Sequence, residues 1–146
     1  MNEIIPQRII RFIRKHHVLT LATCRDNIPY TANCFYVWLD TEQAFVFTSD
    51  TDTRHITDVK ENDFVAGSVV LETHNPGKIR GLQFQGKLEK AENEYFKTCR
   101  KAYLKAFPYA VLMKTELWML RVSFLKLTDN RLGFGTKLIW GTVDGE

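Results

Sequence analysis

Hydroxyl and basic side chains gather in one short segment, residues 47–58, which reads FTSDTDTRHITD. The segment leaves an apolar, strand-like run and places Arg54 where a helix is expected to begin. A guanidinium at the positive end of a helix dipole is unfavourable unless an anion lies beside it. A phosphate there would meet the free N–H groups of a helix that begins near Thr53, Arg54 itself, and a set of hydroxyls. The hydroxyls are those of Thr48, Ser49, Thr51 and Thr53.

A purely structural explanation of the same segment stays open. Thr51 or Asp52 can cap the helix, and Asp50 or Asp52 can pair with Arg54. Composition alone slightly favours this explanation over a phosphate site.

Other motifs offer less chemistry. The segment 133–135, GFG, lacks the third glycine and the strand-to-helix context of a nucleotide loop, so it predicts a β-bulge or a close backbone approach. His55 and His74 have no Cys or carboxylate at metal-ligand spacing, and no signature marks a nucleophile with its base. We therefore predict no metal site and assign no catalytic side chain.

Aromatic residues fall on or beside the expected strands, and most of them are expected in the core: Phe35, Tyr36, Trp38, Phe84, Phe134 and Trp140. A phosphate site next to such strands suits a planar phosphorylated cofactor, because the ring needs a slot and the phosphate needs an anchor.

Length and composition predict a single domain over residues 1–146, with 45% apolar and 25% charged residues. The net charge of +3 is spread without a basic block, so nucleic-acid binding is disfavoured. No apolar run reaches the ~20 residues of a membrane span, and the first residues do not resemble a signal peptide. We expect a cytoplasmic location, no membrane association and three reduced cysteines.

The pattern of apolar residues predicts the elements in order. A helix begins near Pro6 and carries Ile9, Phe12 and Ile13 on one side. Three strands follow at about 18–23, 30–39 and 44–49, with a tight turn at Asp26 and Asn27 that sets Cys34 opposite about Leu19. That register separates Cys34 from Cys24 and disfavours a disulfide.

The second half continues in the same manner. We expect a helix at 53–60, strands at 64–71 and 82–90, a helix at 93–106, a long strand at 116–128 and a last segment at 134–140. The third helix presents an apolar stripe of Phe96, Cys99, Tyr103 and Phe107. Short strands joined mostly by tight turns predict a mainly β fold, an antiparallel barrel or strongly curved sheet with helices packed outside.

Six segments then carry a resemblance to a known family: HHVLTLAT, IPYTANCFYVW, FVFTSDTDTRH, NDFVAGSVV, IRGLQFQG and LTDNRLGFGTKLIW. Together they resemble the pyridoxamine 5′-phosphate oxidase-like split-barrel flavoproteins, and in detail the YhbP-like branch of that superfamily. The likeness to the branch runs over nearly the whole chain.

The resemblance implies a six-stranded antiparallel split β-barrel that forms a homodimer, with FMN held in two clefts at the subunit interface. The implied phosphate contacts are Thr48, Ser49, Thr53, Arg54 and His55. His55 stands where the oxidases usually have lysine, which implies weaker phosphate binding because histidine is mostly neutral at pH 7. The implied ring contacts are the backbone of Asn33, Cys34, Phe35 and Tyr36, with Arg80, Gln83, Lys137 and Trp140 as candidates from the partner subunit.

The implied activity is oxidation or reduction of an unknown small molecule by bound FMN. True pyridoxamine phosphate oxidase activity is disfavoured, because the chain closes with LIWGTVDGE and lacks the C-terminal arginine and histidine motif of those enzymes. Two alternatives stay open: a barrel that binds another planar ligand such as haem, and a non-catalytic dimeric binding module.

Overall fold

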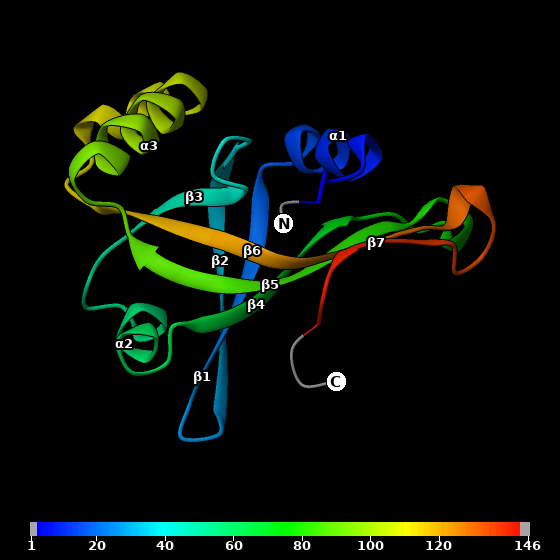
Figure 1. Cartoon of the computed structure of the whole chain (residues 1–146), viewed down its shortest axis with the longest axis horizontal. Coiled ribbons are helices and arrows are strands. Elements are labelled where there is room, and N and C mark those ends of the chain that lie inside the picture. The colour runs from blue at the N-terminus through cyan, green and yellow to red at the C-terminus, as the bar shows by residue number, and fades with distance from the viewer. Residues whose placement is uncertain (1–2, 144–146) are drawn as a thin grey trace.

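The computed structural model describes residues 3–143, and its strands form one antiparallel sheet that closes into a barrel (Figure 1). The strand order is β3-β2-β1-β4-β5-β6-β7, and an additional pairing of β3 with β6 closes the first six strands. The strands are β1 (Val18–Arg25), β2 (Ile28–Leu39), β3 (Ala44–Ser49), β4 (Phe64–Leu71), β5 (Arg80–Lys90), β6 (Glu116–Asp129) and β7 (Lys137–Gly141). The predicted six-stranded antiparallel barrel is confirmed.

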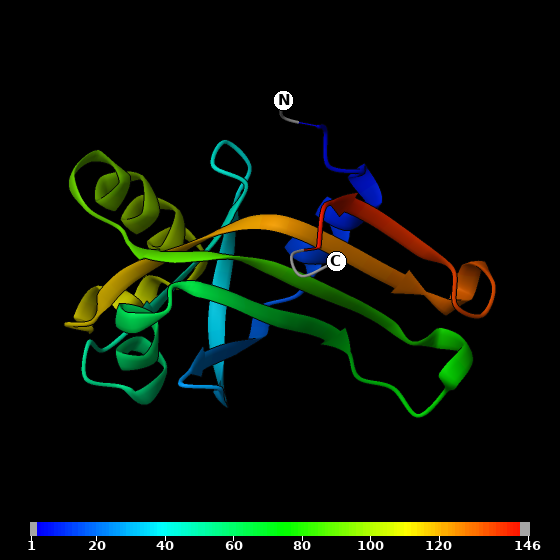
Figure 2. The same cartoon turned by 60° about the horizontal axis from the view of Figure 1, so that its bottom comes forward.

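Three α-helices lie outside the barrel within the described residues: α1 (Gln7–Lys15), α2 (Arg54–Glu61) and α3 (Asn93–Ala106). Short 3-10 turns occur at Pro76–Lys78, Pro108–Leu112 and Asn130–Leu132. No helix in residues 3–143 is long and apolar enough to cross a membrane. Both views place α2 at the end of the barrel away from the turns that precede β5 and β7 (Figures 1 and 2).

The first hairpin sets the register of the barrel. Asp26 and Asn27 have φ values of 53° and 63°, as a two-residue turn that matches the strand twist requires. Leu19 therefore lies opposite Cys34, as predicted. All three cysteines are free.

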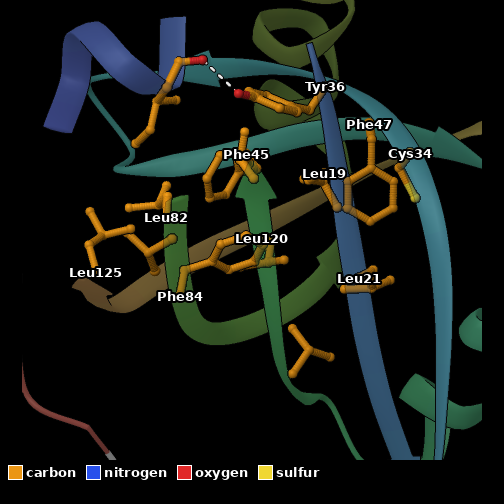
Figure 3. Close-up of a cluster of buried hydrophobic side chains, with 14 of the residues drawn as sticks. Leu19, Leu21, Cys34, Tyr36, Phe45, Phe47, Leu82, Phe84, Leu120 and Leu125 are labelled. Carbon is orange, nitrogen blue, oxygen red and sulfur yellow. Dashed lines mark hydrogen bonds between the residues drawn. The ribbon is translucent and has the colours of Figure 1, made fainter. Parts of the chain in front are cut away.

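Inward-facing side chains of alternate strand positions fill the barrel (Figure 3). Phe45, Phe47 and Phe84 are among the largest fully buried side chains. Tyr36 Oη donates a 2.6 Å hydrogen bond to the carbonyl oxygen of Ile13 and so ties β2 to the end of α1 (Figure 3).

A second apolar layer lies between α3 and the outer side of β3 and β6. Cys99 and Tyr103 from α3 are buried against Val46 and Met119. Phe96, also predicted for this stripe, stays 38% exposed, so only the middle of the helix is fully covered.

Glycines act at two different kinds of position. The register of β5 against β6 shifts between Gln85 and Gly86, and a Cβ on Gly86 would overlap the carbonyl oxygen of Arg121. The β-bulge or close backbone approach expected at the GFG segment is wrong: Gly133 and Gly135 lie in the turn between β6 and β7 with φ values of 122° and 75°, and a Cβ on either would meet no backbone atom within 4 Å. A glycine in the sequence does not show whether it lies at a bulge or in a turn, because both positions favour a residue without a Cβ.

Candidate functional site

The junction of β3 and α2 exposes the start of a helix that no side chain caps. Thr53 is the N-cap residue, but its hydroxyl donates a 2.8 Å bond backward to the carbonyl oxygen of Asp50 and does not accept from the first turn. The first turn of α2 also contains no acidic residue. Its leading N–H groups and the positive end of the dipole therefore remain suited to an anion.

Ser49 and His55 are in direct contact at this junction. Ser49 Oγ lies 2.6 Å from His55 Nε2, and Thr53 Oγ1 lies 3.4 Å from each of them. Trp118 Nε1 donates to the carbonyl oxygen of Ser49 at 3.1 Å and fixes the end of β3. Burial lowers the pKa of His55 below its ordinary value of 6.5, while the charge of Asp58 acts in the opposite direction.

Arg54 has an anionic partner inside the chain, and it is Asp58. Arg54 Nε donates to Asp58 Oδ1 at 3.0 Å across one helical turn. The expectation that Asp50 or Asp52 fills this role is wrong, because those exposed carboxylates lie before the helix, whereas position i+4 lies on the same helix face. The cap is also Thr53 and not Thr51 or Asp52.

Asp58 is fully buried and satisfied by three groups from two elements. Thr23 Oγ1 donates to Oδ2 at 2.9 Å, and Arg25 Nε lies 3.4 Å from Oδ1 beside the bond from Arg54. Burial by itself raises the pKa of Asp58, but the hydrogen bonds from Thr23 and Arg54 and the two positive charges outweigh it, so the pKa lies below its usual value. Asp58 therefore stays ionised and joins α2 to β1.

The Arg54 side chain also contacts Tyr30 and is partly exposed to solvent. Its Cζ lies 5.1 Å from the centre of the Tyr30 ring, and 41% of the side chain is exposed. A planar guanidinium has five N–H donors, and the Asp58 bond uses one of them. Arg54 can therefore hold Asp58 and still donate to an external anion.

Thr48 does not join this cluster. Successive residues of a strand face opposite sides, so Thr48 faces α3 while Ser49 faces His55. Thr48 Oγ1 lies 3.5 Å from Tyr103 Oη, which donates to the carbonyl oxygen of Phe35 at 3.3 Å. Thr48 thus contacts the second predicted region, the middle of β2, through Tyr103.

The predicted ring-binding part of β2 has two faces. Cys34 and Tyr36 point into the core, and burial raises the pKa of the Cys34 thiol to about 12. Asn33 and Phe35 point outward, where Asn33 Oδ1 accepts from Thr20 Oγ1 at 3.0 Å and Phe35 is 53% exposed. Only the backbone and these outward side chains are accessible to a ligand.

The four residues predicted from the partner subunit lie away from α2 within one chain. Arg80 and Lys137 begin β5 and β7, at the opposite end of the barrel (Figure 2). Arg80 Cζ lies 5.9 Å from the Phe12 ring centre, and its buried Nε has no hydrogen-bond partner among the described residues. Trp140 is buried and donates to the carbonyl oxygen of Glu3 at 3.0 Å, so its ring belongs to the core of this chain.

Gln83 lies on the outer face of the sheet, in register with Ser68 on one side and Lys126 on the other. This face contains a hollow of about 450 Å³. Small, uncharged side chains line much of it, among them Thr20, Ala22, Thr31, Ala66 and Ser68. Its size falls in the range of about 300–1,000 Å³ found for ligand sites.

Sequence reasoning missed Asp58, Arg25 and Tyr103 as neighbours of the site. The spacing of Arg54 and Asp58 is a usable signal, since residues at i and i+4 on a helix are adjacent. Arg25 and Tyr103 carry no such signal, because the pairing of β1 with α2 and of α3 with β3 is set by the tertiary fold.

The closed six-stranded antiparallel barrel, with α2 following β3 and an uncapped helix start at that junction, defines a split-barrel protein. A sequence model described as pyridoxamine 5′-phosphate oxidase matches residues 5–131. The chain therefore belongs to the pyridoxamine 5′-phosphate oxidase family, which confirms the resemblance inferred from the sequence.

Two relatives confirm the YhbP-like branch. A UPF0306 protein of Photorhabdus laumondii is 39% identical over 134 residues, which cover 92% of this chain and 94% of that protein. The UPF0306 protein YhbP of Salmonella arizonae is 36% identical over 132 residues, which cover 90% of each chain.

Two solved structures share the fold at low sequence identity. A haem-binding protein from Mycobacterium smegmatis matches with a TM-score of 0.75 and 20% identity over 95% of this chain, which spans 60% of that protein. An FAD-binding protein from Mesorhizobium loti matches with a TM-score of 0.70 and 14% identity, covering 85% of this chain and 94% of the other. At these identities the likeness establishes the fold alone.

Proposed function

We propose that the protein is a homodimeric FMN-binding flavoprotein that oxidises or reduces a small molecule. The observation that carries the proposal is the uncapped start of α2, with Ser49, Thr53, His55 and the donor-rich side of Arg54 around it. Backbone N–H groups, hydroxyls and a guanidinium form the donor set that a phosphate monoester requires. The residues present therefore fit the phosphate of FMN.

The contacts to the FMN ring are proposed from β2 of one copy and from the strands of a second copy. The backbone of β2 near Asn33 and Phe35 would lie along the ring, and Phe35 offers an exposed aromatic side chain. Thr48 would act indirectly, by holding Tyr103 against this strand. Arg80, Gln83 and Lys137 would reach the ring from a second copy, because they lie away from α2 in their own chain, while Trp140 would support β7 from the core.

Bound FMN would supply the electron transfer, and the protein would supply binding and orientation. No side chain is assigned to the chemical step. Cys34 is excluded as a nucleophile near neutral pH, since its pKa of about 12 keeps it protonated.

A second copy fits the outer face of β1, β4 and β5 around Thr20, Ser68 and Gln83. Thr20, Ser68 and Gln83 lie side by side in register across these strands, and none of the helices in residues 3–143 contributes to the lining of the hollow. Small side chains permit close approach of another sheet, and their hydroxyl and amide groups can form hydrogen bonds across the interface. The dimer and its cytoplasmic location remain predictions.

The first test is the visible absorption spectrum of the purified protein with and without added FMN. Arg54→Ala is expected to weaken FMN binding by roughly 10- to 100-fold, since a hydrogen bond to a charged group contributes about 1.5–3 kcal/mol. Arg25→Ala is the matched control, because it also removes a positive charge from Asp58 but lies on β1. Equal losses in the two variants, or unchanged affinity in Arg54→Ala, would reject Arg54 as the anchor.

The same spectra separate the alternatives. Haem is the second candidate ligand, because a solved structure of the same fold is that of a haem-binding protein. Bound haem would give an intense absorption band at the violet end of the visible spectrum in place of the flavin bands. A stable dimer that takes up neither ligand at saturation would indicate a binding module without a cofactor. Mass spectrometry of the small molecules released on denaturation identifies whatever the protein carries.

A further inference from the structure

We propose that His55 couples phosphate binding to proton uptake, so that the site holds a phosphate monoester more tightly as the pH falls. This inference rests on the proposed FMN site and concerns its regulation. It starts from the 2.6 Å contact between Ser49 Oγ and His55 Nε2 at the uncapped start of α2.

The polarity of this contact depends on the protonation state and the tautomer of His55. In the neutral ring with its proton on Nδ1, Nε2 is an acceptor, so the Ser49 hydroxyl donates its only proton to it. In the imidazolium, Nε2 carries a proton and donates to Ser49 Oγ. The hydroxyl proton of Ser49 is then free to point at a bound phosphate oxygen.

Protonation therefore changes the site in two ways at once. It adds a positive charge at the helix start for either tautomer, and for a neutral ring protonated on Nδ1 it also frees the Ser49 hydroxyl to donate toward the ligand. Thr53 Oγ1 lies 3.4 Å from both groups but donates to the carbonyl oxygen of Asp50, so it can accept from His55 Nε2 only when Nε2 carries a proton. The proton comes from solvent, and the phosphate keeps its own charge.

Charged and titratable groups from several elements surround this junction. They are Asp58, Arg54 and Lys60 on α2, Arg25 on β1, Tyr30 on β2, Asp50 and Asp52 before the helix, and Glu116 on β6 with its partner Lys90 on β5. Asp58 is neutralised by Arg25 and Arg54, and Glu116 by Lys90 at 3.5 Å. A dianionic phosphate is the group that would most strongly favour a charged His55.

The direction of the pH dependence follows from linkage. Without ligand, burial keeps the pKa of His55 low, so the ring is neutral near pH 7. A bound phosphate raises the pKa of His55. Binding of each ligand molecule is then accompanied by uptake of as much as one proton by His55. Affinity is greatest below the bound-state pKa and falls as the pH rises through it, by at most about tenfold per pH unit for one proton.

FMN binding is measured by quenching of flavin fluorescence at pH 6.5, 7.5 and 8.5 at constant ionic strength. The phosphate of FMN, with a second pKa near 6, remains mostly dianionic over this range. For the wild type we expect the Kd to rise about tenfold between pH 6.5 and 8.5. Riboflavin, which lacks the phosphate, is the matched ligand and is expected to bind without this slope.

Two variants test the residue. His55→Gln is expected to bind FMN at every pH with the weak affinity that the wild type has at pH 8.5. His55→Lys is expected to bind tightly with a flat profile, since a lysine stays charged below a pKa of about 10.4. If either variant fails to fold, the wild-type comparison of FMN with riboflavin still tests whether phosphate binding is coupled to proton uptake.

A wild-type FMN Kd that stays within twofold across the range would overturn the coupling and leave the FMN site standing. A riboflavin profile with the same slope, or a slope that persists in His55→Gln, would also overturn it. Absence of FMN binding at every pH would overturn both the coupling and the proposed function.

Discussion

Asp58 shows how one buried carboxylate organises the candidate site. It accepts from Thr23 and Arg54 and lies next to Arg25, so it joins β1 to α2 and orients the guanidinium at the helix start. The guanidinium that looks unfavourable at a helix N-terminus is therefore partly neutralised from within its own helix. An external phosphate is compatible with this arrangement but is not needed to explain it.

Stability should depend on pH through Asp58. Its folded-state pKa lies below the usual value, so its contribution to the free energy of unfolding is complete above the unfolded-state pKa of about 3.9 and is lost as the pH falls through the folded-state value. Denaturant unfolding of Asp58→Asn at pH 7 and pH 3 should show a lower stability at pH 7 and a smaller acid loss than the wild type.

Asp52→Asn is the control for this prediction, because Asp52 is an exposed carboxylate in the neighbouring turn. It should keep the acid loss of the wild type. An Asp58→Asn profile parallel to that of the wild type would show that the ion pairs around Asp58 contribute nothing to acid sensitivity.

Among the elements, β5 pairs with β6 through a bulge that depends on Gly86. A methyl group there would meet the carbonyl oxygen of Arg121, which cannot move without breaking the pairing of the two strands. Gly86→Ala should therefore lower the free energy of unfolding by roughly 1–3 kcal/mol, the usual cost of forcing atoms into a packed region.

Gly81→Ala on the same strand is the matched control, since a Cβ there meets no atom within 4 Å. It should leave the stability unchanged or raise it by up to about 1 kcal/mol, because alanine restricts the unfolded chain. Chemical denaturation of both variants measures the difference. Equal effects would show that the close approach at Gly86 relaxes without cost.

At the scale of the whole molecule, the outer face of β1, β4 and β5 is the surface through which two copies are expected to join. Ser68→Arg places a long cation between Thr20 and Gln83 and should shift the protein from dimer to monomer in light scattering. Lys101→Glu, an exposed change on α3, should leave the mass of the dimer unchanged. A Ser68→Arg variant that remains dimeric would place the interface elsewhere.

The order and type of the elements could be predicted from local pattern. The period of apolar residues marked the three helices and the strands, and Asp26 with Asn27 marked the turn that sets Leu19 opposite Cys34. These features depend on residues close in the chain. The bulge at Gly86 was missed because the oxygen that requires it belongs to Arg121, on another strand.

The same distinction between local sequence and tertiary structure applies to the candidate site. The sequence by itself determined the family and the barrel, through six segments that together resemble it, and the hydroxyl-rich approach to a helix that begins beside Arg54, which is a property of one segment. Only the tertiary structure decided that Ser49 and not Thr48 contacts His55, and that Arg25 and Thr23 reach Asp58. The physical reason is that the direction of each strand side chain and its partners are fixed by pairing across the barrel, which local sequence does not specify.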